Sequence, residues 1–295
     1  MLVKEKLEQR EKFSDLEKII ANYILEKAEK IKVETVRSIA DKTYSSPSSV
    51  MRFFQKIGYE GYNEFKEEYL KELKYLSSHF QNINPNFPFQ NNDKNVVVAN
   101  KISTLYQETL LDTLSLVDHD SLQQAINILR DSEDIYIIAS GAQVGLCDVF
   151  KDKMMKIGKT VVIYHSEQDL YYEACYTNPK NCFIIISYSG ETPKPLKSAP
   201  KLIERKIPTI VITSFGNNTL SNMFDCCLYV STREKLISKI GNYSLNLSVL
   251  YVLDVLYSNY FNLAYDDNYK NKVKNSIDFE NHRFSQNPIL KEEHD

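Results

Sequence analysis

The chain has 295 residues, of which 43% are hydrophobic, and its formal net charge is −3. On a prior of roughly 150 residues per domain, this length predicts about two domains, and this composition supports packed cores. The slightly negative charge excludes a basic surface over the whole chain, so any contact with nucleic acid must come from a local patch.

The sequence shows no sign of export, membrane insertion or metal binding. Its N-terminal stretch is charged throughout, and no window approaches the length of an uninterrupted apolar membrane span. The five cysteines include no CxxC pair, and the five histidines have no second ligand at helical spacing. We therefore expect reduced thiols in a cytoplasmic protein that has no metal site, no cofactor and no membrane partner.

Four helices are predicted before residue 78. The first follows Ser14, where "SDLE" is a capping box, and a short second helix covers residues 35–43. The third has Ser46 as its N-cap and Pro47 at its first helical position, and it ends at Gly58. The fourth covers residues 62–76. Apolar spacing predicts that these inner faces are buried: Val36, Ile39, Ala40, Val50, Phe53, Phe54 and Ile57.

The second and third helices form a candidate helix-turn-helix. Hydroxyl groups at a helix N-terminus suit phosphates or base edges, and an arginine can make bidentate contacts in the major groove. The residues predicted to contact DNA are Lys42, Ser46, Ser48, Ser49, Arg52 and Lys56. From the residues alone, the alternative is a small helical bundle used for dimerisation.

The rest of the chain predicts an α/β domain. Residues 79–95 carry prolines and many asparagines without periodicity, which indicates a linker. Helices are predicted at 96–117, 120–132 and 242–264. Continuously apolar runs, which indicate strands covered on both faces, lie at 135–140, 160–164, 182–187, 209–214 and 226–230. We expect a doubly wound, five-stranded parallel sheet in the flavodoxin-like order 2-1-3-4-5.

The predicted domain boundaries follow from these elements. A helix-turn-helix domain covers 1–78, a linker covers 79–95, the α/β domain covers 96–265, and a polar C-terminal tail covers 266–295. The tail is interpreted as mobile, with a short helix at 267–276 as the alternative.

Two loops rich in serine and glycine fall at the predicted switch point of the sheet. The stretch "SGAQVG" (140–145) follows the first strand, and "SYSGET" (187–192) follows the third, its neighbour in the predicted order. Short hydroxyls, an unhindered glycine and free amides suit a phosphate, although a turn with a helix cap would use the same residues. The sequence lacks a G-x-S-x-G nucleophile elbow, a Walker A loop and a dinucleotide-binding GxGxxG loop.

The N-terminal region resembles the helix-turn-helix of the RpiR family of bacterial transcription regulators. The resemblance is carried by "SPSSVMRF" (46–53) and by "KIGYEGYNEFK" (56–66), which match S-x-x-[ST]-V-x-R-F and K-x-G-[FY]-x-G-[FY]-x-E-[FL]-K. The turn departs from the pattern, because Tyr44 stands where a small residue is expected and Ser45 where an aliphatic is usual. The resemblance implies binding to a double-stranded DNA operator.

Residues 95–264 resemble the SIS, or sugar isomerase, domain, which binds phosphorylated sugars; "IYIIASGAQVG" and "CFIIISYSGETPKPL" carry the match. The resemblance implies that Ser187, Ser189, Gly190 and Thr192 hold the phosphate. In the first loop, Ser140, Gly141 and Gln143 are also expected to bind, with Gln143 in place of a hydroxyl. Glu191 and Glu234 are the acids expected to reach sugar hydroxyls, although Glu191 could instead be a solvated loop acid and Glu234 a helix-start acid.

Another departure follows the second loop, where Pro193 and Pro195 remove two amides from the first turn of the next helix. Together these features favour a regulator of sugar or amino-sugar metabolism, not an enzyme, that acts as a homodimer or homotetramer and whose operator binding responds to a phosphorylated sugar. Two alternatives remain: a sugar-phosphate isomerase of the same fold, and a dimerisation module with a degenerate pocket.

Overall fold

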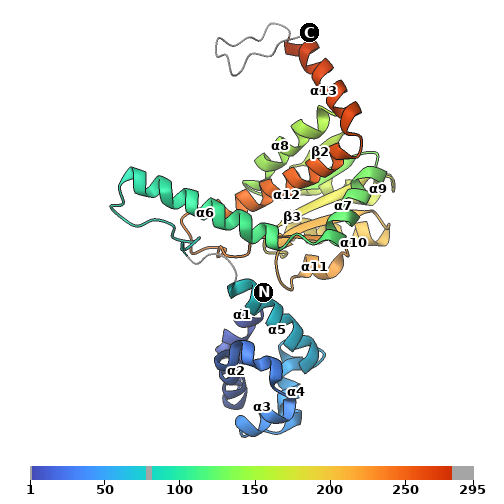
Figure 1. The fold of residues 1–295 in the computed structure, drawn as a ribbon. Coiled ribbons are helices and arrows are strands. Elements are labelled where there is room, and N and C mark those ends of the chain that lie inside the picture. The colour runs from blue at the N-terminus through green and yellow to red at the C-terminus, as the bar shows by residue number, and fades with distance from the viewer. Residues whose placement is uncertain (1, 78–81, 281–295) are drawn as a thin grey trace. The chain divides into compact units, whose positions relative to one another are not determined.

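The computed structural model describes residues 2–77 and 82–280 (Figure 1). Residues 78–81, which include part of the predicted linker, and residues 281–295 of the predicted tail lie outside the described residues. The chain divides into two compact units, one of which comprises residues 1–118, 187–192 and 212–248. Within the described residues, no helix combines the length and the apolar character that crossing a bilayer requires.

The N-terminal region is helical, as predicted. The four expected helices are present, and Ser14 and Ser46 cap the first and third of them through the side-chain hydrogen bonds that the sequence indicated. A short helix and two 3-10 turns were not predicted, because they are brief and have weak apolar periodicity. The elements are α1 (Val3–Glu8), η1 (Arg10–Lys12), α2 (Asp15–Lys27), η2 (Ala28–Val33), α3 (Val36–Lys42), α4 (Pro47–Lys56) and α5 (Tyr62–Ser77).

Aromatic side chains fill the core of this helical region. Phe53 and Phe54 on α4 are fully buried, and the Phe54 ring lies 4.5 Å from the ring of Phe65 on α5, centroid to centroid. Ile39 on α3 is also fully buried. The predicted inward faces of α3 and α4 are therefore confirmed, and their burial leaves the polar sides of both helices exposed.

Glu34 accepts hydrogen bonds from three of these elements, α2, α3 and α5. Its carboxylate accepts hydrogen bonds from Tyr23 of α2 (3.0 Å), from Ser38 of α3 and from the Lys42 ammonium (3.2 Å). Its backbone carbonyl accepts a hydrogen bond from the Tyr62 hydroxyl at 2.9 Å. The hydrogen bonds from Ser38, Lys42 and Tyr23 lower the pKa of Glu34, although its burial opposes this shift.

Replacing Glu34 by Gln is expected to destabilise the protein at neutral pH by about 1–3 kcal/mol, because charge-assisted hydrogen bonds are lost. A lowered pKa in the folded state contributes stability above the ordinary carboxyl pKa, and this contribution is lost as the pH falls through the folded value. Urea unfolding from pH 7 down to pH 3 should therefore show the two proteins converging. The control is Glu29→Gln at an exposed site on η2; a constant difference for Glu34→Gln across this range would contradict the prediction.

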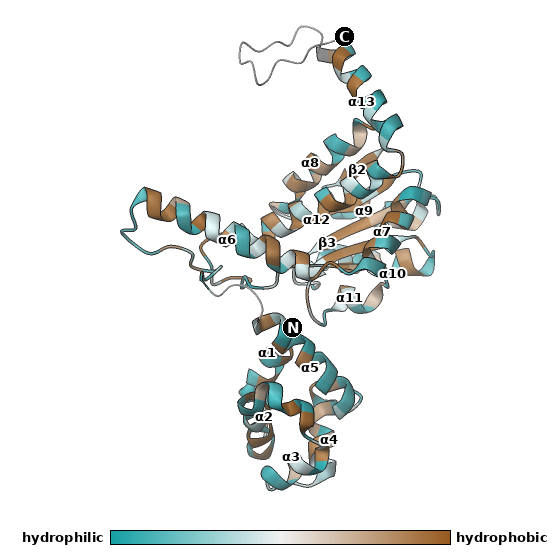
Figure 2. Ribbon diagram, viewed as in Figure 1, coloured by the Kyte–Doolittle hydropathy of each residue, from teal (hydrophilic) through white to brown (hydrophobic). Residues whose placement is uncertain are grey.

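The C-terminal region is built on a five-stranded sheet in the predicted order, β2-β1-β3-β4-β5. All strands are parallel; in register, Ile135 of β1 lies opposite Val161 of β2 and Cys182 of β3. Every residue of β3 is buried, which is why the strand is continuously apolar (Figure 2). The strands are β1 (Ile135–Ile138), β2 (Val161–Tyr164), β3 (Cys182–Ser187), β4 (Thr209–Ser214) and β5 (Cys227–Val230).

Helices flank this sheet (Figure 1), and they alternate with the strands along the chain as the sequence indicated. Part of the predicted polar tail is helical, so the helical alternative describes residues 265–280; Tyr265 and Tyr269 stack on one face of this helix. The helices are α6 (Asn95–Ser115), α7 (His119–Asp131), α8 (Gln143–Met155), α9 (Glu167–Tyr176), α10 (Pro193–Glu204), α11 (Thr219–Met223), α12 (Tyr243–Asn262) and α13 (Tyr265–Glu280).

Candidate functional site

The N-terminus of α4 carries a cluster of hydroxyl groups. Ser46 caps the helix by accepting a hydrogen bond from the Ser49 amide at 3.1 Å, and its oxygen lies 2.9 Å from the hydroxyls of both Ser48 and Ser49. Ser46 and Ser48 are exposed, and Arg52 is exposed one turn further along. This end of α4 therefore offers hydroxyls, amides and a guanidinium to a ligand.

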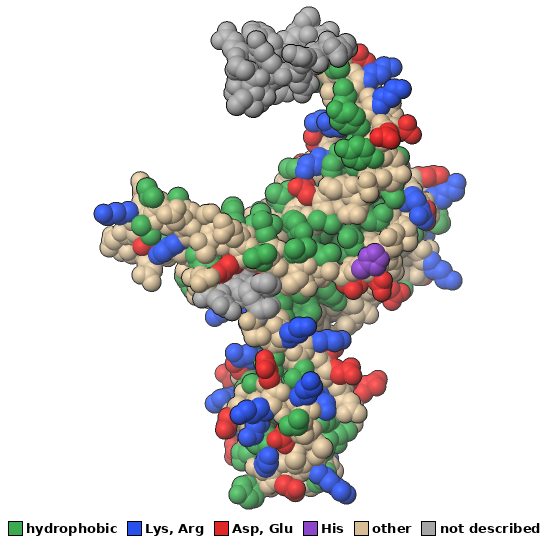
Figure 3. Space-filling model, in the orientation of Figure 1, with side chains coloured by type: hydrophobic (Ala, Val, Ile, Leu, Met, Phe, Trp, Pro, Cys, Tyr) green, Lys and Arg blue, Asp and Glu red, His purple; other side chains and the backbone are tan. Residues whose placement is uncertain are grey.

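The basic residues of this candidate DNA interface differ in whether they form ion pairs with nearby carboxylates. Lys42 pairs with Glu34, and the Lys56 ammonium lies 2.7 Å from the carboxylate of Glu17. Among the described residues, no carboxylate lies within ion-pair distance of Arg52. On the face drawn in Figure 3, basic and acidic side chains are interspersed over the N-terminal helices. Of these three cations, Arg52 is therefore the one that could meet DNA without breaking an ion pair of the described residues.

The loop after β3, residues 187–192, has a fixed internal geometry. The hydroxyls of Ser187 and Thr192 lie 2.7 Å apart, and the Glu191 amide donates a hydrogen bond to the Ser189 hydroxyl at 3.1 Å. Gly190 adopts φ +67°, and a Cβ atom built there would lie 1.9 Å from Oδ1 of Asn218. Only glycine fits this backbone, because a side chain would be strained and would collide with Asn218. The turn at Gly190 brings the predicted hydroxyls of this loop close together.

Asn218, in the loop after β4, packs closely against this turn and was not singled out in the sequence. It is buried, its amide donates to the hydroxyl of Thr213 at 3.2 Å, and its Oδ1 accepts from the Ser221 amide at 2.9 Å. The stretch "NNTL" before a short helix is a recognisable capping signal. The close approach to Gly190, in contrast, leaves no trace in the sequence.

Both predicted acids accept hydrogen bonds at the N-terminus of a helix. Glu191 accepts hydrogen bonds from the amide (2.8 Å) and hydroxyl (2.7 Å) of Thr219, the first residue of α11. Glu234 is buried, accepts from the Ser244 amide near the start of α12 and pairs with Lys239 at 3.3 Å. Burial raises the pKa of Glu234, against the effect of these two partners. Glu234 thus serves a helix start, in keeping with its alternative, whereas Glu191 is an exposed loop acid that also binds the start of α11. For both carboxylates a role at sugar hydroxyls stays a prediction.

The loop after β1 contains the other predicted site residues. Gly141 adopts φ +61°, and Gln143 is the first residue of α8. The N-cap of α8 is Ala142, which makes no side-chain capping hydrogen bond. Since β1 and β3 are parallel neighbours, this loop and residues 187–192 leave the same edge of the sheet, as the predicted strand order required.

Lys194 is a further cation at this edge that the sequence did not indicate. It belongs to the first turn of α10, where Pro193 and Pro195 both lie, as expected. Its ammonium donates hydrogen bonds to the carbonyl oxygens of Tyr164 (2.8 Å) and His165 (3.1 Å), at the carboxyl end of β2. Burial lowers the pKa of Lys194.

A buried polar network joins α5, α6 and the segment after β5. The carboxylate of Asp112 on α6 accepts hydrogen bonds from the Tyr75 hydroxyl (2.8 Å), the Ser231 hydroxyl (2.6 Å) and the Arg233 guanidinium (2.9 Å). Arg233 also donates to the carbonyl oxygens of Tyr75 and Leu76 at the end of α5. Asp112 is fully buried, so its charge depends on these partners.

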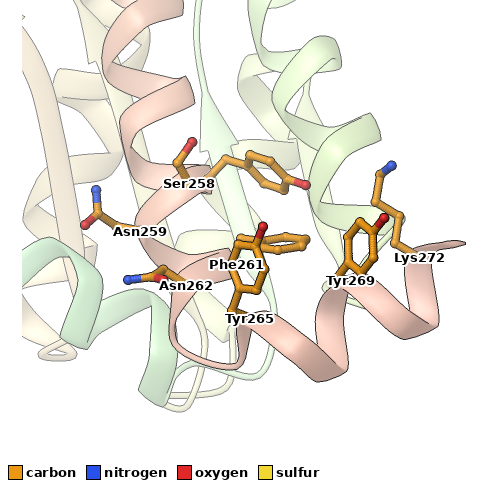
Figure 4. A pocket seen from close by; sticks show the side chains of 8 residues that line it. Ser258, Asn259, Phe261, Asn262, Tyr265, Tyr269 and Lys272 are labelled. Carbon is orange, nitrogen blue, oxygen red and sulfur yellow. The ribbon is translucent and has the colours of Figure 1, made fainter.

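A hollow of about 470 Å³ lies along the last two helices, away from the residues predicted to bind (Figure 4). Four of its eight lining residues are aromatic, and these four form a row of neighbouring rings: Tyr257, Phe261, Tyr265 and Tyr269. Within the described residues, no group of three histidine, cysteine or acidic side chains could hold a metal ion.

These features define a class: a helix-turn-helix transcriptional regulator that carries an SIS domain. Family comparison agrees with the fold. Residues 1–75 match the helix-turn-helix domain of the rpiR family, and residues 128–258 match the SIS domain. The chain therefore belongs to the rpiR family of transcriptional regulators, as the resemblance in the sequence implied.

Individual relatives are similar over most of their length. An HTH-type transcriptional regulator of Thermotoga maritima is 24% identical, over 85% of this chain and 88% of the relative. YbbH of Bacillus subtilis, also an HTH-type transcriptional regulator, is 23% identical over 84% of this chain and 86% of its own. Among solved structures, the Vibrio vulnificus NanR protein complexed with ManNAc-6P is 21% identical, with a TM-score of 0.61 over 96% of this chain and 100% of that one.

Replacing Gly190 by Ala is expected to destabilise the loop, because the new Cβ atom would both strain the backbone and collide with Asn218. Strain and overpacking together should cost about 2–5 kcal/mol in the free energy of unfolding. The matched control is Gly158→Ala, which has φ +80° but open space around its Cβ position and should show the backbone strain alone. If both variants lost the same free energy of unfolding in denaturant, the close packing described for Gly190 would be disproved.

Proposed function

We propose that this protein controls transcription of genes for sugar or amino-sugar metabolism, and that a phosphorylated sugar bound at the carboxyl edge of the sheet changes its affinity for an operator. The observation that carries the proposal is the loop of residues 187–192. Its three hydroxyls are gathered around Gly190, Asn218 packs closely against its backbone, and Glu191 links it to the N-terminus of α11. A turn that offers hydroxyls and backbone amides suits an anion.

Ser187, Ser189, Gly190 and Thr192 are the proposed phosphate contacts. Pro193 and Pro195 remove amides from the start of α10, so these loop groups must supply the hydrogen bonds. Ser140, Gly141 and Gln143 are proposed to complete the site, because they follow the strand next to β3. That the relative of known structure was solved with ManNAc-6P supports a phosphosugar as the ligand class.

On the DNA side, α4 is the proposed recognition helix. Ser46, Ser48, Ser49 and Arg52 would meet the major groove, and Lys42 and Lys56 would exchange their internal ion pairs for phosphates. We expect the protein to work in the cytoplasm, where a bacterial operator lies.

The isomerase alternative has less support. An isomerase needs a base and an acid that can reach the sugar, and the nearest candidates are Glu191 and Glu234. Both carboxylates serve helix N-termini in this structure, and Glu234 also pairs with Lys239. The relatives reported above are named as transcriptional regulators.

Self-association is also part of the proposal. Leu110, Leu111 and Leu114 lie exposed on α6, and the aromatic hollow of α12 and α13 is open to solvent. Surfaces of this kind are typical of interfaces between subunits. A dimer or tetramer of this chain would present paired α4 helices to two half-sites of a near-palindromic operator.

The two binding activities should be separable by mutation. Ser189→Ala combined with Thr192→Ala should abolish stabilisation by phosphosugars while operator binding persists; saturation a hundredfold above Kd should stabilise the wild type by about 2.7 kcal/mol. Thermal shift with a panel that contains ManNAc-6P and inorganic phosphate measures this. Thr160→Ala, at an exposed position before β2, is the control. Unchanged ligand binding by the double variant would rule out this loop as the phosphate site.

Arg52→Ala should show the reverse behaviour. Loss of a guanidinium contact to a base should weaken operator binding by about 1–3 kcal/mol and leave phosphosugar binding intact. Arg10→Ala, which removes the same charge from η1, should bind DNA like the wild type. Fluorescence anisotropy with an operator selected from the protein's own upstream region measures both variants. Normal binding by Arg52→Ala would show that α4 does not read the DNA as proposed.

The buried network around Asp112 is the proposed link between the two activities. Tyr188, in the loop of residues 187–192, donates a hydrogen bond to the backbone carbonyl of Glu234 at 2.7 Å. The neighbouring Arg233 binds the end of α5, and the Thr232 amide donates to the Tyr75 hydroxyl at 2.7 Å. A change in the loop is thereby connected by hydrogen bonds to the last helix of the DNA-binding region.

Tyr75→Phe should therefore reduce the coupling, because it removes the hydroxyl that Asp112 and Thr232 share. Both ligands should still bind, but the factor by which phosphosugar changes operator affinity, typically about 5–150-fold in allosteric proteins, should shrink toward one. Tyr69→Phe, a buried tyrosine on the same helix, is the control. If coupling survives in Tyr75→Phe as in the control, this network does not transmit the signal.

A further inference from the structure

Tyr44 lies in the turn of the helix-turn-helix in a conformation that normally belongs to glycine. Its φ is +51°, and the Ser45 amide donates a hydrogen bond to the carbonyl of Ala40 at 2.9 Å. Tyr44 is thus the left-handed residue of the Schellman motif that ends α3, a position where a Cβ atom is disfavoured. The same motif ends α4, where the residue is Gly58 with φ +91°.

Among the described residues, none forms a hydrogen bond or ring contact with the tyrosine side chain that would offset this strain. This side chain is 96% exposed, the most solvent-accessible of the exposed large hydrophobic side chains among the described residues. Aromatic residues elsewhere in the helical region, such as Phe53 and Phe65, are fully buried. A tyrosine with a strained backbone and an exposed ring points to a contact of that ring outside this chain.

We infer that Tyr44 contacts the sugar-phosphate backbone of DNA beside the N-terminus of α4, its phenol hydroxyl donating to a phosphate oxygen. This inference rests on the DNA-binding function proposed above. Tyr44 precedes the N-cap Ser46 by two residues, so it flanks the exposed hydroxyls of Ser46 and Ser48. Tyrosine hydroxyls are regular donors to phosphates, and such contacts position a protein without reading sequence.

The inference predicts opposite effects on stability and on binding. In Tyr44→Gly the turn loses its strain, so the denaturation midpoint should equal or exceed that of the wild type. The affinity for DNA should nevertheless fall by about tenfold, as expected for a lost hydrogen bond to a charged group. A residue kept for folding would show the reverse, a lower midpoint and unchanged affinity.

A matched control exists at Lys206, which has φ +56° and ends α10 in the same motif, since the Ile207 amide donates to the carbonyl of Leu202 at 2.9 Å. Lys206→Gly should release similar strain without affecting DNA binding. Tyr44→Phe keeps the ring and loses the hydroxyl, so it should reproduce most of the loss of affinity while the midpoint stays at the wild-type value.

Binding is measured by fluorescence anisotropy on the full-length protein with a labelled duplex of random sequence, because a phosphate contact does not require the operator. A neutral phenol releases no counterion, so the slope of log K against log salt should be the same for Tyr44→Gly and the wild type. Wild-type affinity in both Tyr44 variants, or a changed salt slope, would overturn the inference. Failure of the wild-type protein to bind any duplex would instead contradict the proposed function.

Discussion

The buried carboxylate of Asp112 is the constraint on which the first compact unit depends. A charge removed from water costs several kcal/mol unless hydrogen bonds compensate it. Here the compensation comes from two segments far from Asp112 in the sequence: Tyr75 at the end of α5, and Ser231 and Arg233 after β5. Because these partners all stabilise the same carboxylate, the end of α5, α6 and the segment after β5 are joined by hydrogen bonds within this unit.

Polar contacts extend from this point. On α6, the hydroxyls of Thr109 and Thr113 each lie 2.8 Å from a serine hydroxyl of α12, Ser244 and Ser248. Ser244 also donates its amide to Glu234, whose backbone receives the Tyr188 hydroxyl. Hydrogen bonds have defined partners and directions, unlike apolar packing, so such a network favours discrete arrangements over gradual deformation. That property suits the role in coupling proposed for it.

Much of the architecture was predictable because it depends on local chemistry. Ser14 and Ser46 cap their helices, and the apolar run at 182–187 forms a strand buried on both faces. The order of the strands followed from the rule for doubly wound sheets. The loop at 187–192 could be located for the same reason, since its composition and its place after a strand are both visible in the sequence. The helix at 265–280 was less clear, because its polar residues hide the stacking of Tyr265 on Tyr269.

The sequence by itself determined the two kinds of domain, the strand order and the chemical character of the loops, because caps, periodicity and turn residues act over a few neighbouring positions. Only the tertiary structure decided how individual side chains are used. Glu191 and Glu234 bind helix N-termini, and Asn218 excludes any side chain at Gly190. Lys42 and Lys56 form ion pairs, whereas no carboxylate of the described residues pairs with Arg52. These outcomes depend on which atoms meet across long stretches of chain, and that is set by packing rather than by local pattern.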